Sequence, residues 1–167
     1  MRRTGFFLIF LLIMLAGCRP DPKSKANDWA RRFPEEIGTW EADNDRLELT
    51  PENASSFGHV TLTYEGDDDI FAYLSVDVYA TETAANVALG EKVRGWQLQG
   101  ARFETDRRGG ERVDIATFPG GTLAYMQSRD TVITLTIIPP DPAEVAIPQD
   151  EIEILIDTMV EVVRNAS

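Results

Sequence analysis

The sequence predicts an α+β fold, an antiparallel meander sheet with two main helices packed on one face. Three observations lead to this class. Residues 70–80 alternate between aliphatic and other side chains, as in a strand with one buried face. Residues 81–99 repeat apolar side chains every three to four positions, as in an amphipathic helix. Short strand-like runs then follow one another at hairpin spacing, which favours antiparallel pairing.

The first predicted elements are short. Asn27 or Asp28 can cap a helical turn, because their side-chain oxygens accept hydrogen bonds from the first free N–H groups. That turn carries Trp29 and Phe33. A short strand is expected at residues 46–50.

The centre of the sheet is predicted from two alternating runs. Residues 59–64 form the first, and residues 66–69 form the turn after it, since Gly and Asp favour positive φ and local hydrogen bonds. Residues 70–80 form the second and clearest strand. A helix then begins at Thr81, a good N-cap residue.

The second half of the chain contains the meander and the last helix. A helical stripe after Pro148, a residue that favours the first position of a helix, continues to the C-terminus. The four meander strands before it are expected at residues 101–105, 111–117, 122–127 and 131–138.

Composition excludes several classes of function. The chain has 167 residues, 16 basic and 28 acidic side chains and a formal net charge of −12. Nucleic-acid binding is excluded, because so acidic a chain cannot neutralise a row of phosphates. The one Cys excludes an internal disulfide, and the one His excludes any site that needs two imidazoles. This length suits a single domain, which we place at residues 26–167.

A short apolar leader opens the chain. Arg2 and Arg3 precede the apolar stretch 6–16, which is shorter than the roughly 20 residues of a membrane span but typical of a signal-peptide core. The stretch ends in a run that resembles the lipobox of bacterial lipoproteins, Leu15-Ala16-Gly17-Cys18.

This resemblance implies that residues 1–17 are a signal peptide and that Cys18 carries a covalent lipid with acyl chains such as palmitate. Residues 18–25 would then be the lipidated Cys and a polar linker. Arg19 is not the aspartate associated with inner-membrane retention, which favours the outer membrane where the organism has one. One alternative is an ordinary secretory signal peptide in which the Cys is incidental. The other is a cytosolic protein whose N-terminus is apolar.

The rest of the chain also resembles uncharacterised bacterial lipoprotein domains. The shared features are the opening at residues 33–40 and the strand 74–79, which leads into a helix that begins with alanines. The order of elements is similar to the photosystem-accessory and transport-factor sandwich fold. These resemblances imply an accessory domain of the cell envelope and carry no catalytic residues.

We expect no catalysis and name no catalytic residue. The single candidate base is His59, with Ser55 and Ser56 just before it. No G-x-S-x-G or S-x-x-K motif surrounds these serines. A surface His at the start of a strand is the simpler interpretation.

No metal site is assigned, although the acidic turn after residue 64 contains weak candidates. Asp67, Asp68 and Asp69 offer carboxylates for a hard cation such as calcium. The turn does not match the D-x-D-x-D-G loop with its distal Glu, so a solvated hairpin turn is the alternative. The covalent lipid on Cys18 is the one non-protein group that we expect.

The candidate binding surface is the non-aliphatic face of strand 70–80. Phe71, Tyr73 and Tyr79 share this face with threonines of neighbouring strands. Aromatic side chains with few charges are typical of binding surfaces.

The alternative is a covered face, with the N-terminal segment and its Trp29, Phe33 and Trp40 folded across these rings. Both interpretations predict that Phe71 and Leu74 lie on opposite sides of the sheet.

The sequence therefore predicts a lipid-anchored, extracytoplasmic interaction or accessory domain of the bacterial envelope. Its expected partners are the membrane, through the anchor, and an envelope protein. The alternative function is a small-ligand or cation-binding lipoprotein that uses the aromatic face or the acidic turn.

Overall fold

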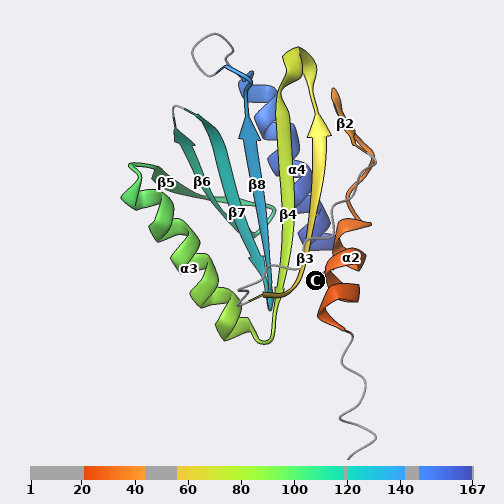
Figure 1. Cartoon of the computed structure of the whole chain (residues 1–167), viewed down its shortest axis with the longest axis vertical. Coiled ribbons are helices and arrows are strands. Elements are labelled where there is room, and N and C mark those ends of the chain that lie inside the picture. The colour runs from red at the N-terminus through yellow and green to blue at the C-terminus, as the bar shows by residue number, and fades with distance from the viewer. Residues whose placement is uncertain (1–20, 44–55, 119, 142–146, 167) are drawn as a thin grey trace, which may run out of the picture.

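The computed structural model of the chain describes residues 21–43, 56–118, 120–141 and 147–166 (Figure 1). Its helices are α2 (Pro22–Ala30), the 3-10 turn η1 (Asp67–Asp69), α3 (Glu82–Leu98) and α4 (Gln149–Ala166). Its strands are β1 (Glu36–Ile37), β2 (Trp40–Ala42), β3 (Ser56–Glu65), β4 (Phe71–Tyr79), β5 (Arg102–Arg108), β6 (Glu111–Phe118), β7 (Gly121–Ser128) and β8 (Thr131–Ile138).

The described strands form one antiparallel sheet in the order β1-β2-β3-β4-β8-β7-β6-β5. The run from β5 to β8 is the predicted meander. Strand β8 then pairs with β4 over almost its whole length, from Phe71↔Ile138 to Val78↔Thr131. The α+β class and the antiparallel sheet are therefore as predicted.

The sheet has two unlike faces. We call the face that carries Leu74 and Leu135 the back face, and the face that carries Tyr73 and Thr134 the front face. The back face supports the main hydrophobic core, in which side chains of α2 and α4 pack against β3, β4, β7 and β8. Leu74 belongs to this core and Phe71 does not, so the predicted opposite orientation of these two residues is confirmed.

The prediction that both main helices pack on one face is wrong. Helix α4 lies behind the sheet in Figure 1, whereas α3 lies in front of it. In α3, the buried Ala85 and Ala88 contact Tyr79 and Val132 of the front face. The short alanine side chains let α3 approach two bulky residues there, while α4 fills the back face with large aliphatic residues.

The first described helix begins earlier than the sequence predicts. Asp21, not Asn27 or Asp28, caps α2 by accepting a hydrogen bond from the Ser24 N–H at 3.2 Å, and Pro22 opens the helix. Aspartate is favoured at the N-cap of a helix and proline at its first helical position. Residues 22–25, predicted as linker, are therefore the first turn of α2.

Helix α2 is packed tightly against the sheet. A Cβ built on Gly58 of β3 would lie 2.2 Å from the backbone oxygen of Pro22, so only glycine allows this approach. Trp29, Phe33 and Trp40 belong to the back-face core. The alternative in which these residues cover the front-face aromatics is therefore wrong.

Several other boundaries agree with the prediction. The Thr81 hydroxyl oxygen accepts from the Ala84 N–H at 3.1 Å, so Thr81 is the N-cap of α3. The turn at residues 66–69 contains η1, and α4 follows Pro148. The predicted strand at residues 46–50 and Cys18 lie outside the described residues.

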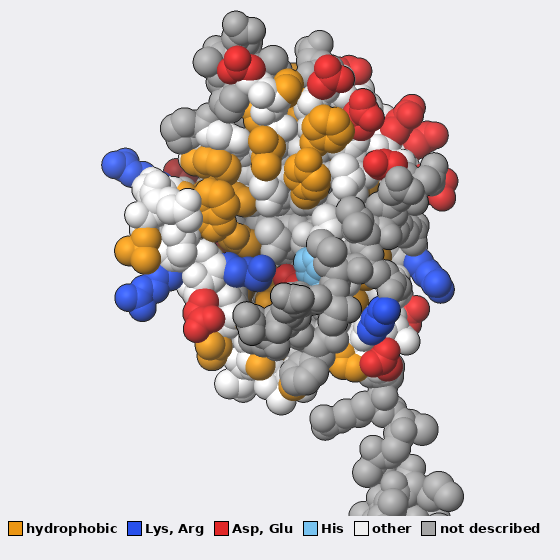
Figure 2. Space-filling view, viewed as in Figure 1, with side chains coloured by type: hydrophobic (Ala, Val, Ile, Leu, Met, Phe, Trp, Pro, Cys, Tyr) orange, Lys and Arg blue, Asp and Glu red, His pale blue; other side chains and the backbone are white. Residues whose placement is uncertain are grey.

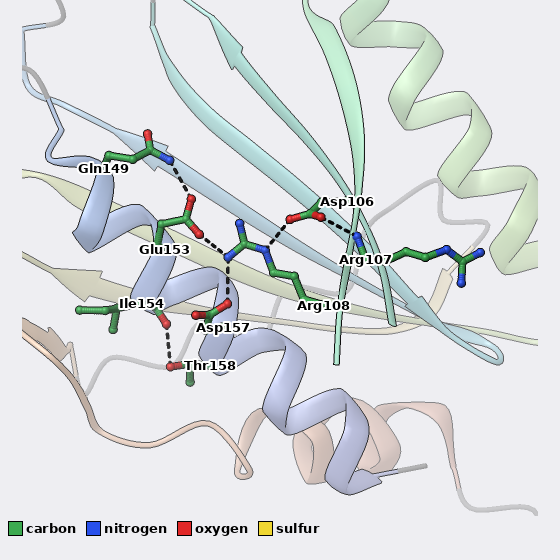
Figure 3. Close-up of polar contacts among 8 residues, drawn as sticks. All are labelled: Asp106, Arg107, Arg108, Gln149, Glu153, Ile154, Asp157 and Thr158. Carbon is green, nitrogen blue, oxygen red and sulfur yellow. Dashed lines mark hydrogen bonds and ion pairs between the residues drawn. The ribbon is translucent and has the colours of Figure 1, made fainter. Parts of the chain in front are cut away.

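Arg108 links the β5–β6 hairpin to α4 on the back face. Figure 3 shows its guanidinium between Asp106 of the same strand and two carboxylates of α4. Its Nε donates to Asp106 at 2.9 Å, and its Nη1 contacts Asp157 at 2.8 Å and also Glu153. The neighbouring Arg107 pairs across the strands with Arg112 and points to the front face.

The network lowers the pKa of two of its carboxyls. The hydrogen bond from Arg108 is the largest cause for both Asp106 and Glu153, and Gln149 adds a second hydrogen bond to Glu153. Each acid holds its negative charge to lower pH in the folded chain than in the unfolded chain. This stabilisation is complete above the unfolded pKa values and is lost as the pH falls through the folded ones.

We expect Arg108→Met to lower the free energy of unfolding by about 1–2 kcal/mol at neutral pH, because a half-buried hub of several ion pairs is lost. Urea denaturation measures the change. The difference from wild type should shrink in acid, as the carboxyls are protonated. Arg107→Met is the matched control and should change little, and equal effects of the two variants would contradict the assignment.

Candidate functional site

Helix α3 leaves part of the front face uncovered. In Figure 2, which views this face, hydrophobic side chains gather on its upper part and acidic side chains lie beside them. Beside α3, three adjacent strands contribute alternate residues to the front face, and Asp77 and Thr134 among them are buried. These residues are His59, Thr61, Thr63, Phe71, Tyr73, Ser75, Asp77, Thr134, Thr136 and Ile138.

Two of the three predicted binding residues lie together. The rings of Phe71 and Tyr73 are stacked, with centroids 6.5 Å apart and planes at 26°. Ile138 of β8 lies directly opposite Phe71 across the strands. Tyr73 is 37% exposed and Ile138 41% exposed. We call Phe71, Tyr73 and Ile138 the aromatic patch.

Tyr79, the third predicted binding residue, is not part of this patch. It is only 3% exposed, because Ala85 and Ala88 of α3 cover it. Burial, together with the nearby charge of Asp77, raises the pKa of its hydroxyl above the usual range. Ile138 was missed, although the alternation of residues 131–138 places it on the same face as Thr134 and Thr136.

A chain of polar contacts lies lower on the same face. His59 Nδ1 is 2.7 Å from Asp77 Oδ1, and His59 Nε2 is 3.0 Å from Thr61 Oγ1. Thr61 Oγ1 is in turn 2.9 Å from Ser75 Oγ. Lys92 of α3 completes the chain with its Nζ 3.3 Å from Asp77 Oδ2. The register of β3 and β4 brings these side chains together, since His59 pairs with Asp77 and Thr61 pairs with Ser75.

The environment of Asp77 favours its charged form. Burial alone would raise its pKa, but the hydrogen bond with His59 and the charge of Lys92 outweigh that effect. The pKa of Asp77 therefore lies below its ordinary value of 3.8. A buried, charged carboxylate between two strands and a helix stabilises their arrangement.

The order Thr61–His59–Asp77 is that of a nucleophile, a base and an acid. Ser55 and the side chain of Ser56, which the sequence places just before His59, lie outside the described residues. The described hydroxyl that contacts His59 is that of Thr61. Such a relay catalyses acyl transfer only with donors placed for the developing oxyanion. The contacts here run between β3 and β4, and the ion pair of Lys92 with Asp77 also joins β4 to α3.

The predicted acidic candidates form η1. Asp67 and Asp69 are exposed, and Asp69 has a positive φ of 57°; the side chain of Asp68 is outside the described part. Within the described ranges, no three His, Cys, Asp or Glu side chains gather closely enough to hold a metal ion.

Comparison with known proteins assigns no family. No family model matches the sequence, and no curated protein is significantly similar to it. The extracellular domain of PknH from Mycobacterium tuberculosis is similar in structure, with a TM-score of 0.48 and 8% identity, over 84% of this chain and 91% of that chain. A likeness at this level assigns neither family nor function. None of the described helices is long and apolar enough to cross a membrane.

We expect Asp77→Asn to lower the free energy of unfolding at neutral pH by about 1–3 kcal/mol, since His59 and Lys92 lose their charged partner. Because the folded pKa of Asp77 lies below 3.8, its contribution is present above that pH and fades as the pH falls through the folded value. Urea denaturation at several pH values measures both effects.

The control is Asp69→Asn, an exposed position where Asn also tolerates positive φ. If Asp77→Asn were as stable as this control at neutral pH, the stabilising role of the polar chain would be excluded.

Proposed function

We propose that the chain is a lipid-anchored, extracytoplasmic accessory domain that binds an envelope protein through the aromatic patch. The observation that carries the proposal is the stacked pair Phe71–Tyr73 beside Ile138, in which Tyr73 and Ile138 are exposed and Phe71 is half-buried. Exposed aromatic residues in the middle of a sheet cost solubility, and burial against a partner removes that cost.

The patch binds through side chains rather than through a free strand edge. Strand β4 is paired with β3 on one side and β8 on the other, and β8 is also paired with β7. A partner therefore cannot extend the sheet at this point. It has to supply an apolar surface that packs on the rings.

The charges around the patch favour a partner with a basic rim. Glu65 pairs across the strands with Phe71, and Asp67 and Asp69 are exposed in the turn between β3 and β4. Figure 2 shows acidic side chains gathered beside the hydrophobic ones. Lysines or arginines around an apolar centre would complement this surface and speed association.

The position of the anchor supports a protein partner over the lipid surface. Three residues lie between Cys18 and Pro22, and the four Cα–Cα steps reach about 15 Å at full extension. The start of α2 shares a groove with Tyr79, at the end of β4 opposite the patch. Tyr73 lies six residues from Tyr79, or about 20 Å along the strand. The patch is thus at the end of the domain away from the anchor.

We expect a photo-crosslinking residue at position 73 to capture a discrete envelope protein in intact cells, because that side chain is exposed within the patch. The matched control places it at Ile154 of α4, which is also exposed but lies on the other side of the sheet. The readout is a shifted band, with the partner identified by mass spectrometry. Adducts that are the same at both positions, or absent at both, would exclude the patch as an interface.

We expect Cys18→Ala to abolish lipid attachment and release the domain from the membrane fraction, because only the thiol forms the thioether. Intact-mass analysis and fractionation of cells provide the readouts. Lipid still attached to the variant would contradict the anchor, while leaving the patch experiment unaffected.

A further inference from the structure

A second concave surface lies on the front face, between α3 and strands β5 to β7, away from the aromatic patch. It has a volume of about 540 Å³, within the range of small-molecule sites. Its lining combines aromatic, aliphatic, amide and charged side chains, a composition unlike the aromatic patch.

The inner part of the groove is apolar. The rings of Phe103 and Tyr125 stack with centroids 5.7 Å apart and planes at 30°. Leu89 and Val93 of α3 form the facing wall and are only half buried. Gly90 lies on the same wall, and a Cβ built on it meets nothing within 4 Å. The groove therefore has room for an apolar group against the rings.

One charged pair in the groove is already satisfied. Asp114 is buried and accepts from Arg112 Nε at 3.1 Å and Nη2 at 3.0 Å. Its Oδ1 also accepts from the Thr105 hydroxyl at 2.6 Å. This cluster leaves no net charge for a ligand to neutralise.

The other two charged groups of the lining, Arg129 and Glu82, form no ion pair with any described residue. They flank one amide, since Gln127 Nε2 donates to the Arg129 carbonyl at 2.8 Å and to the Glu82 carbonyl at 3.5 Å. The two residues of opposite charge thus start from the same end of the groove, and both are exposed.

The backbone of Arg129 also has a conformation that is unfavourable for arginine. Its φ is 54°, in the left-handed region that favours glycine and asparagine. The two-residue turn between β7 and β8 calls for this conformation, which glycine or asparagine would adopt at lower cost, and the Arg129 guanidinium has no carboxylate partner among the described residues. Strain of this kind often marks a residue held for binding.

We propose that this groove binds a small zwitterion of the α-amino acid class with a large apolar side chain. The ligand carboxylate would pair with Arg129 and its ammonium with Glu82, while the side chain lies against Phe103 and Tyr125. A simple anion fits less well, since it would face Glu82 without a compensating positive charge.

Calorimetry on the full-length protein in detergent micelles tests the ligand class. The probes are L-phenylalanine, 3-phenylpropionate, which lacks the ammonium, and 2-phenylethylamine, which lacks the carboxylate. We expect saturable binding of phenylalanine, at least about tenfold tighter than either analogue, since each analogue leaves one charge unpaired. Equal binding of an analogue, or no heat with millimolar phenylalanine, would overturn the proposal.

Two helix variants test the location. Gly90→Leu should fill the groove and abolish binding, whereas Gly95→Leu, on the same helix but outside the lining, should preserve it. Neither new side chain begins in a clash, because a Cβ at each position meets nothing within 4 Å. Loss of binding in both variants, or in neither, would exclude this groove.

Arg129→Gly separates binding from folding. It relieves the positive φ, so the melting temperature should rise or stay unchanged while phenylalanine binding weakens about tenfold or more. Unchanged affinity would exclude Arg129 as the carboxylate partner. Crosslinking through position 73 should be unaffected by all three variants, which distinguishes failure of this site from failure of the aromatic patch.

Discussion

The pairing of β4 with β8 is the constraint on which the rest of the structure depends. It joins the β3–β4 hairpin to the meander formed by β5 to β8, so two locally folded halves share one sheet. The register also decides what each face contains. A slip by one residue would exchange Leu74 for Tyr73 in the core, and the back face would lose its aliphatic surface.

The two faces then differ because their helices differ. Helix α4 buries large aliphatic residues and closes the back face together with α2. Helix α3 offers only Ala85 and Ala88 as buried contacts, so it covers a narrow part of the front face. The ion pair of Lys92 with Asp77 adds to this contact, and no other helix among the described residues packs on the front face on either side of α3.

The two proposed sites follow from that incomplete cover. On one side of α3 the sheet exposes the aromatic patch, which suits a protein surface because its strands have no free edge. On the other side the helix stands away from β5 to β7 and leaves a groove of small-molecule size. A domain anchored near the start of α2 would present the patch away from the bilayer, and its acidic charge would be repelled by anionic headgroups.

Local patterns in the sequence determined much of this protein. The alternation of residues 70–80 was sufficient to separate Leu74 from Phe71, and the Thr81 cap and hairpin-sized turns located α3 and the meander, since each depends on near neighbours in the chain. Tertiary structure decided the face on which each helix packs, the burial of Tyr79 under α3, and the contacts of His59 with Asp77 and Thr61. It also brought Arg129 and Glu82 to one groove. These outcomes depend on pairing between residues far apart in sequence, which local hydrophobic periodicity does not specify.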